Sequence, residues 1–137
     1  MKVVASLDTN VLVRLIVRDD ETQSLAAVNL LVQHVKKSKS FFVAVTVMLE
    51  LEWVLRSRYK FIKPDVVLAL SSLLMTFELM FESEDALEQA LASYEDGDAD
   101  FADCLHLALS SKAEALPFWT FDAVASREVG AKRLKWH

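Results

Sequence analysis

The hydrophobic pattern of the chain changes repeatedly between two periods. Short apolar runs, typical of buried strands, occupy residues 2–7, 41–45 and 118–121, and weaker ones occupy 78–81 and 133–136. Between them, apolar residues recur every three or four positions and predict helices at about 10–18, 21–37, 46–59, 64–75, 83–94 and 100–113. Residues 122–128 indicate a turn or a short helix. This alternation predicts an α/β fold with a parallel sheet flanked by helices.

Polar residues mark the expected helix boundaries. Asp19 and Asp20 interrupt the first helical pattern, Thr46 and Ser83 suit N-cap positions, and Pro64 suits a first helical turn. With two Gly and two Pro among 137 residues, the chain offers no linker and no Gly-rich phosphate-binding loop. Its hydrophobic content of 53% is enough for one core. We therefore expect a single domain over residues 1–137.

Cysteine content and the N-terminal segment indicate the compartment. A single cysteine, Cys104, excludes an internal disulfide and a Cys-rich zinc pattern, which fits a reducing cytosol. The apolar residues before Asp8 are too few for a signal peptide or a membrane span. We expect a cytoplasmic protein with no membrane partner.

Charge is segregated along the chain, although the net charge is only −5. No Lys or Arg occurs in residues 64–111, whereas cations gather in residues 36–39, 56–63 and 127–135. Each basic cluster alone is typical of a solvated surface or a helix C-terminus. Clusters that converge around an acidic site would be able to hold a phosphate backbone.

Four acidic residues are the candidates for chemistry. Asp8, Glu50, Asp103 and Asp122 lie at the end of an apolar run or inside an apolar helix, with no Lys or Arg three or four positions away. Three of them follow predicted strands, and the carboxyl ends of parallel strands share one edge of a sheet. Crowded carboxylates require a counter-charge, and oxygen donors without a Cys or His set favour Mg²⁺ or Mn²⁺ over zinc. The pattern predicts a divalent-metal site.

Nearby polar residues extend this site. Asn10 and Thr120 supply neutral oxygens beside Asp8 and Asp122, and Asp100 lies three residues before Asp103. Simpler roles for these residues also fit the sequence. Asp8 or Asn10 would cap the first helix, Asp100 would cap its own, and Asp122 would be an ordinary turn residue.

Other conspicuous residues are predicted to have structural roles. Trp53, Phe101 and Trp119 are expected in the core, and Cys104 is expected to be a small buried hydrophobe. His106 has no second histidine at metal-binding spacing, which favours a structural or peripheral role. Next to Glu50, Glu52 is expected to face solvent.

Four acidic segments resemble the motifs of PIN-domain toxins of the VapC type, in family order. The opening is similar to the first motif and its surroundings, and three later segments are similar to the remaining ones. These segments are Asp8-Thr9-Asn10-Val11-Leu12-Val13-Arg14 with Asp19-Asp20 and Gln23, then Glu50-Leu51-Glu52-Trp53-Val54-Leu55, Asp100-Phe101-Ala102-Asp103-Cys104-Leu105 and Thr120-Phe121-Asp122. Cys104 and His106 are local departures from the third motif.

The resemblance implies a specific fold and activity. The fold would be a PIN-like three-layer α/β/α domain whose central, mainly parallel sheet has about four to five short strands. The activity would be that of a Mg²⁺- or Mn²⁺-dependent endoribonuclease, the toxin of a toxin-antitoxin pair, in which a metal-activated water hydrolyses RNA. Asp8, Glu50, Asp103 and Asp122 would bind metal, with Asp100 as an additional acid and Asn10 and Thr120 as supporting groups. Partners would be RNA, a small cognate antitoxin and a second copy of the chain.

Other function classes stay open from the sequence. A receiver-like phosphoacceptor also gathers acids at strand ends, but it needs a Lys near its last strands and an acidic pair at the first. This chain has Asp8-Thr9 and no Lys in residues 64–111. A catalytically silent PIN-like scaffold and a structure-specific DNA nuclease are the remaining alternatives.

Overall fold

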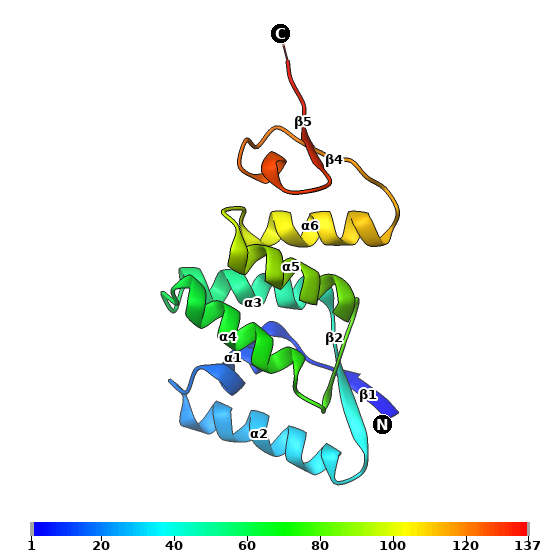
Figure 1. The fold of residues 1–137 in the computed structure, drawn as a ribbon. Helices are drawn as coiled ribbons and strands as arrows, with labels where there is room; N and C mark the ends of the chain where they lie inside the picture. The colour runs from blue at the N-terminus through cyan, green and yellow to red at the C-terminus, as the bar shows by residue number, and fades with distance from the viewer. Residues whose placement is uncertain (1, 137) are drawn as a thin grey trace. The chain divides into compact units, whose positions relative to one another are not determined.

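The structure is a computed structural model that describes residues 2–136. It divides into two compact units, Met1–Glu82 and Ser83–His137, each of which is described by itself (Figure 1). The single domain expected from the sequence therefore stays a prediction.

The first unit is a three-stranded parallel sheet with four helices. The strands β1 (Lys2–Ser6), β2 (Lys39–Val43) and β3 (Leu79–Phe81) pair in the order β1-β2-β3. Parallel neighbours need long crossover connections, and helices supply them in both cases. The pair α1 (Thr9–Ile16) and α2 (Glu21–Val35) joins β1 to β2, and the pair α3 (Val45–Ser57) and α4 (Lys63–Leu74) joins β2 to β3.

The core of the first unit gathers around the central strand. Phe41 and Val43 of β2 are fully buried because β2 has a neighbour on both sides. Helical residues spaced three or four apart complete the core: Leu12, Met48, Leu51, Leu55, Val66 and Leu70. The amphipathic patterns of the sequence thus place one stripe of each helix inside.

The second unit is a helix pair followed by a short strand pair. The helices α5 (Glu84–Asp96) and α6 (Phe101–Lys112) pack on each other, and β4 (Phe118–Thr120) pairs in parallel with β5 (Ala131–Arg133). The short 3₁₀ helix η1 (Ala125–Arg127) lies between the strands in sequence. The rings of Tyr94 and Phe101 meet edge to face, with centroids 5.7 Å apart. Gly130 directly precedes β5 and has a φ of +95°, a conformation that favours glycine.

The α/β class and the parallel pairing expected from the sequence are confirmed. The number of short strands, five among the described residues, also agrees with the prediction. They are paired as two sheets, of three and two strands. Across residues 2–136, the helices fall short of the length and apolarity needed to cross a membrane.

Two predicted boundaries were wrong because long-range contacts set them. α3 begins at Val45 after the N-cap Ala44, not at Thr46, and the Val45 N–H donates to Glu82 Oε1 at 2.8 Å. The N-cap position of α5 is Ser83, as predicted, although Ser83 has a left-handed conformation and its side chain makes no cap hydrogen bond. The last strand is Ala131–Arg133, earlier than the predicted 133–136, because it pairs with β4 directly after Gly130.

Candidate acidic site

Asp8 lies immediately beyond the carboxyl end of β1. The Leu7 N–H donates to the Phe42 carbonyl at 3.0 Å, so the pairing with β2 continues up to the residue before Asp8. Asp8 is the N-cap of α1, and its Oδ1 accepts the Thr9 N–H at 2.7 Å. The capping role predicted as the simpler alternative is therefore present, and it occupies one carboxylate oxygen.

Glu50 is the second acid of this edge. It lies on the exposed side of α3, and its Oε1 accepts a hydrogen bond from Thr9 Oγ1. Thr9 itself is only 5% exposed. Among the described residues, neither Asp8 nor Glu50 forms an ion pair with Lys or Arg. In the described part of the first unit, these two carboxylates thus share the neutral residue Thr9 and have no ion-pair partner.

The remaining polar residues of the opening segment stabilise the start of the fold. Arg14 forms an ion pair with Asp19, and its Nη2 donates to the Tyr59 hydroxyl at 3.2 Å. Asp20 caps α2 by accepting the Gln23 N–H at 3.0 Å. Asn10 is exposed and shares a cavity of about 340 Å³ with Arg14 and Gln23.

Glu52 was expected to face solvent, and this prediction was wrong. Its exposed fraction is 2%, and its Oε2 accepts from Arg56 Nε at 2.8 Å. The buried stripe of α3 runs through Met48, Leu51, Glu52 and Leu55, which are three and four residues apart. Arg56, four positions after Glu52, is the sequence signal that indicates this pair.

Two aromatic predictions were also wrong. Trp53 and Trp119 were expected in the core but are 54% and 56% exposed. Trp53 comes directly after Glu52 in α3 and is not part of the buried stripe. Trp119 lies on the three-residue strand β4, which has a strand neighbour on one side. Phe101 and Cys104 are buried as predicted.

In the second unit, Asp100 and Asp103 occupy the start of α6. Asp100 is the N-cap, and its Oδ1 accepts the Asp103 N–H at 2.8 Å. Burial raises the pKa of the Asp103 carboxyl, and the charge of Asp100, its hydrogen bond to Asp103 and the charge of Asp122 raise it further; His106 acts in the opposite direction. Asp103 therefore holds its proton more tightly than an isolated aspartate does.

Asp122 closes the turn after β4. Its Oδ1 accepts the N–H groups of Val124 at 2.8 Å and Ala125 at 2.9 Å, and Thr120 Oγ1 accepts the Asp122 N–H at 3.0 Å. Asp122 therefore has the turn role that its sequence position allows, and Thr120 supports the turn by accepting the Asp122 N–H. The second carboxylate oxygen receives no hydrogen bond among the described residues.

His106 lies one helical turn after Asp103 and is exposed. Its ring centroid is 6.2 Å from that of Phe118. It contributes to the electrostatic environment of Asp103. These contacts agree with the peripheral role predicted for it.

The donor chemistry of these acids suits a hard divalent cation. The candidate ligands offer oxygen only, and no Lys or Arg of residues 2–136 forms an ion pair with any of them. Within that range, no three Asp, Glu, His or Cys side chains form a group that would hold a metal ion. The structure thus shows Asp8 with Glu50, and Asp100 and Asp103 with Asp122, and the complete ligand set stays a prediction.

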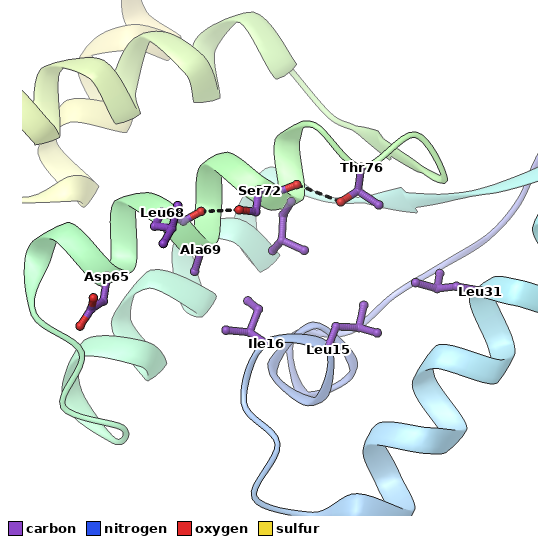
Figure 2. A pocket seen from close by; sticks show the side chains of 9 residues that line it. Leu15, Ile16, Leu31, Asp65, Leu68, Ala69, Ser72 and Thr76 are labelled. Carbon is purple, nitrogen blue, oxygen red and sulfur yellow. Dashed lines mark hydrogen bonds between the residues drawn. The ribbon is translucent and has the colours of Figure 1, made fainter.

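The first unit also contains an apolar groove, shown in Figure 2. Its volume is about 450 Å³, and its apolar lining comes from three helices: Leu15 and Ile16 of α1, Leu31 of α2, and Leu68, Ala69 and Leu73 of α4. Two of its hydroxyls are bound to the backbone of their own helix region. Ser72 Oγ donates to the Leu68 carbonyl at 2.8 Å, and Thr76 Oγ1 donates to the Ser72 carbonyl at 2.9 Å. These bonds leave a mainly apolar surface.

Comparison with known proteins identifies the family. The family model "PIN domain" matches residues 5–129, which include all of the candidate acids. The chain belongs to the PIN domain family, a family of nucleases. The family match spans the ends of β1 and β4, where Asp8 and Asp122 lie.

A solved structure gives a weaker likeness. The crystal structure of Mycobacterium tuberculosis VapC20, a Sarcin-Ricin loop cleaving toxin, is similar over 90% of this chain and 94% of that chain, at 20% identity and a TM-score of 0.41. At this TM-score, the family assignment rests on the sequence match. A comparison with curated proteins found no match.

Proposed function

We propose that this protein is a divalent-metal-dependent endoribonuclease, the toxin of a toxin-antitoxin pair. The observation that carries the proposal is the pair of carboxylates, Asp8 and Glu50, which are both hydrogen-bonded to Thr9 and form no ion pair with Lys or Arg among residues 2–136. The crowded Asp103 and membership of the PIN family support it. RNA as the substrate and the toxin role follow from the motif resemblance.

Asp8, Glu50, Asp103 and Asp122 would hold the ion, Mg²⁺ or Mn²⁺. When bound, a divalent ion supplies Lewis-acid stabilisation of phosphate charge and makes water a stronger nucleophile. Asp8 and Asp122 each accept local N–H groups with Oδ1, and the other carboxylate oxygen would bind the ion. Asp103 must release its more tightly held proton before it can act as a ligand, so ion binding at this position is favoured by rising pH.

The neutral and outer groups have positioning roles in this scheme. Thr120 holds the backbone of Asp122, and Asp100 holds the first turn of α6 that carries Asp103. Asn10 adds an exposed amide beside Asp8. Asp100 also repels the ionised form of Asp103, which fits an additional acid that helps to attract a cation.

Cleavage of structured RNA tests the activity. We expect the wild type to cleave a defined pool of tRNA and other structured RNAs with Mg²⁺ or Mn²⁺ and to lose this activity in EDTA. Asp8→Asn should lower the rate at least about a hundredfold, because removing a ligand charge weakens both ion binding and transition-state stabilisation. Asp98→Asn, an exposed acid outside the candidate set, is the matched control and should keep full activity.

The same assay distinguishes the alternatives. Full activity of Asp8→Asn in a preparation free of contaminating nuclease would contradict the assignment. Faster cleavage of a matched DNA substrate would support a structure-specific DNA nuclease. A protein that binds metal through Asp8 and cleaves neither substrate would be a PIN-like scaffold.

The partners proposed are a small antitoxin and a second copy of the chain. The groove of Figure 2 is lined by the apolar residues Leu31, Leu68 and Leu73, which would offer contacts to a partner. Asp65, at the same groove, suits a basic side chain on the antitoxin. Co-expression of the antitoxin should restore growth of cells that produce the wild type, and Leu68→Asp should abolish this rescue while leaving RNA cleavage intact. Sedimentation of the purified chain measures the dimer.

A further inference from the structure

We infer that Thr9 is a positioning residue that fixes the carboxylates of Asp8 and Glu50 for metal binding. The inference rests on the proposed function and extends it to a residue that carries no charge. Thr9 occupies the first position of α1, between the exposed residues Asp8 and Asn10, yet its side chain is buried.

Thr9 contacts both acids through different atoms. Its backbone N–H donates to Asp8 Oδ1 at 2.7 Å, and its hydroxyl donates to Glu50 Oε1. Glu50 is 41 positions further along the chain, on α3. One buried residue therefore links the end of β1 to the second helix turn of α3.

A hydroxyl suits this position better than a cation would. An Arg or Lys between the two carboxylates would neutralise them and compete with a metal ion for the same oxygens. The Thr9 hydroxyl donates one hydrogen and adds no charge, so the negative potential of the pair is kept. It restrains an exposed, flexible Glu side chain and occupies only one of its oxygens.

Other buried hydroxyls of the first unit show that burial alone does not produce such a contact. Ser24 and Ser40 are each 2% exposed, and their hydroxyl oxygens have no hydrogen-bond partner among the described residues. Ser24 also lies near the start of a helix, α2. It is the matched control for loss of a buried hydroxyl.

Metal affinity of the metal-free protein, measured with Mn²⁺ by titration calorimetry, tests the inference. Thr9→Val keeps the shape of the side chain and removes the donor, and we expect it to raise the Kd for Mn²⁺ about tenfold or more, with the melting temperature in EDTA close to that of the wild type. Thr9→Ser restores the donor and should bind Mn²⁺ within about twofold of the wild type. Ser24→Ala should leave the Kd unchanged.

The outcomes separate this inference from the proposed function. Unchanged Mn²⁺ affinity in Thr9→Val, with affinity lost in Glu50→Gln, would overturn the positioning role and leave the metal-dependent function standing. Equal weakening in Thr9→Val and Thr9→Ser would also overturn it, because a donor would not explain the effect. Absence of Mn²⁺ binding by the wild type would overturn both.

Discussion

At the scale of single residues, the candidate acids combine a structural and a chemical role. Asp8, Asp100 and Asp122 each accept backbone N–H groups at the start of a helix or turn, as their sequence positions indicate. Such bonds use one carboxylate oxygen and orient the other. A capping interpretation and a ligand interpretation of the same aspartate are therefore compatible.

Asp103 should make the metal-free protein depend on pH. Its pKa is raised in the folded state, so the stability it contributes is present below its ordinary pKa and is lost as the pH rises through the raised value. We expect Asp103→Asn to raise the melting temperature by a few degrees at pH 7 in EDTA, and by less at pH 3.5, where more of the wild-type carboxyl is protonated. Thermal denaturation at both pH values measures this; an equal gain at both would contradict it. Asp98→Asn is the control.

The Glu52–Arg56 pair should contribute to stability without a role in metal binding. Arg56→Ala removes the guanidinium that faces a buried carboxylate, and we expect a loss of about 2 kcal/mol in the free energy of unfolding. Urea denaturation measures the loss, with Arg58→Ala, an exposed neighbour, as control. Loss of Mn²⁺ affinity in Arg56→Ala, with stability unchanged, would contradict this division of roles.

At the scale of elements, the positions of Glu50 and Asp103 depend on where the helices that carry them begin. α3 starts at Val45, whose N–H is capped by Glu82 from the end of β3, and this start determines which side of the helix Glu50 occupies. α6 starts after Asp100, which places Asp103 in its first turn. The starts of α3 and α6 thus help to position the candidate acids.

Removal of the Glu82 cap should destabilise α3. We expect Glu82→Ala to lower the free energy of unfolding by about 1 kcal/mol, the usual cost of a lost N-cap interaction. Glu88→Ala, an exposed glutamate inside α5, should change stability little. Chemical denaturation compares the two variants, and equal effects would show that the Glu82 contact does not cap the helix.

At the scale of the whole molecule, ion binding should stabilise the folded chain. A ligand that binds only the folded state adds about 2.7 kcal/mol at a hundred times its Kd. We expect Mn²⁺ to raise the melting temperature of the wild type and to leave that of Asp8→Asn nearly unchanged. The melting temperature of each protein in metal-free buffer with EDTA is the reference value. An equal Mn²⁺ shift in both proteins would place the bound ion away from Asp8.

The order of helices and strands could be predicted because it depends on local periodicity. Every predicted helix is present, and the caps Asp8, Asp20 and Asp100 each accept a backbone N–H that lies within three residues. Thr46 and Glu52 were assigned incorrectly because Glu82 and Arg56, together with the buried stripe of α3, decide their environments. The Arg56 signal was available in the sequence, whereas the Glu82 contact, 37 positions from Val45, was not.

The sequence by itself determined the α/β class, the helix starts made by neighbouring acids, and the four acidic residues without nearby cations. These properties follow from residue period and from charges three or four positions apart. Only the tertiary structure decided that Thr9 is buried and bonded to Glu50, that Glu52 is internal, and that Trp53 is exposed. Such outcomes depend on which elements pack together, and hydrogen bonds between residues 41 positions apart leave no local pattern in the chain.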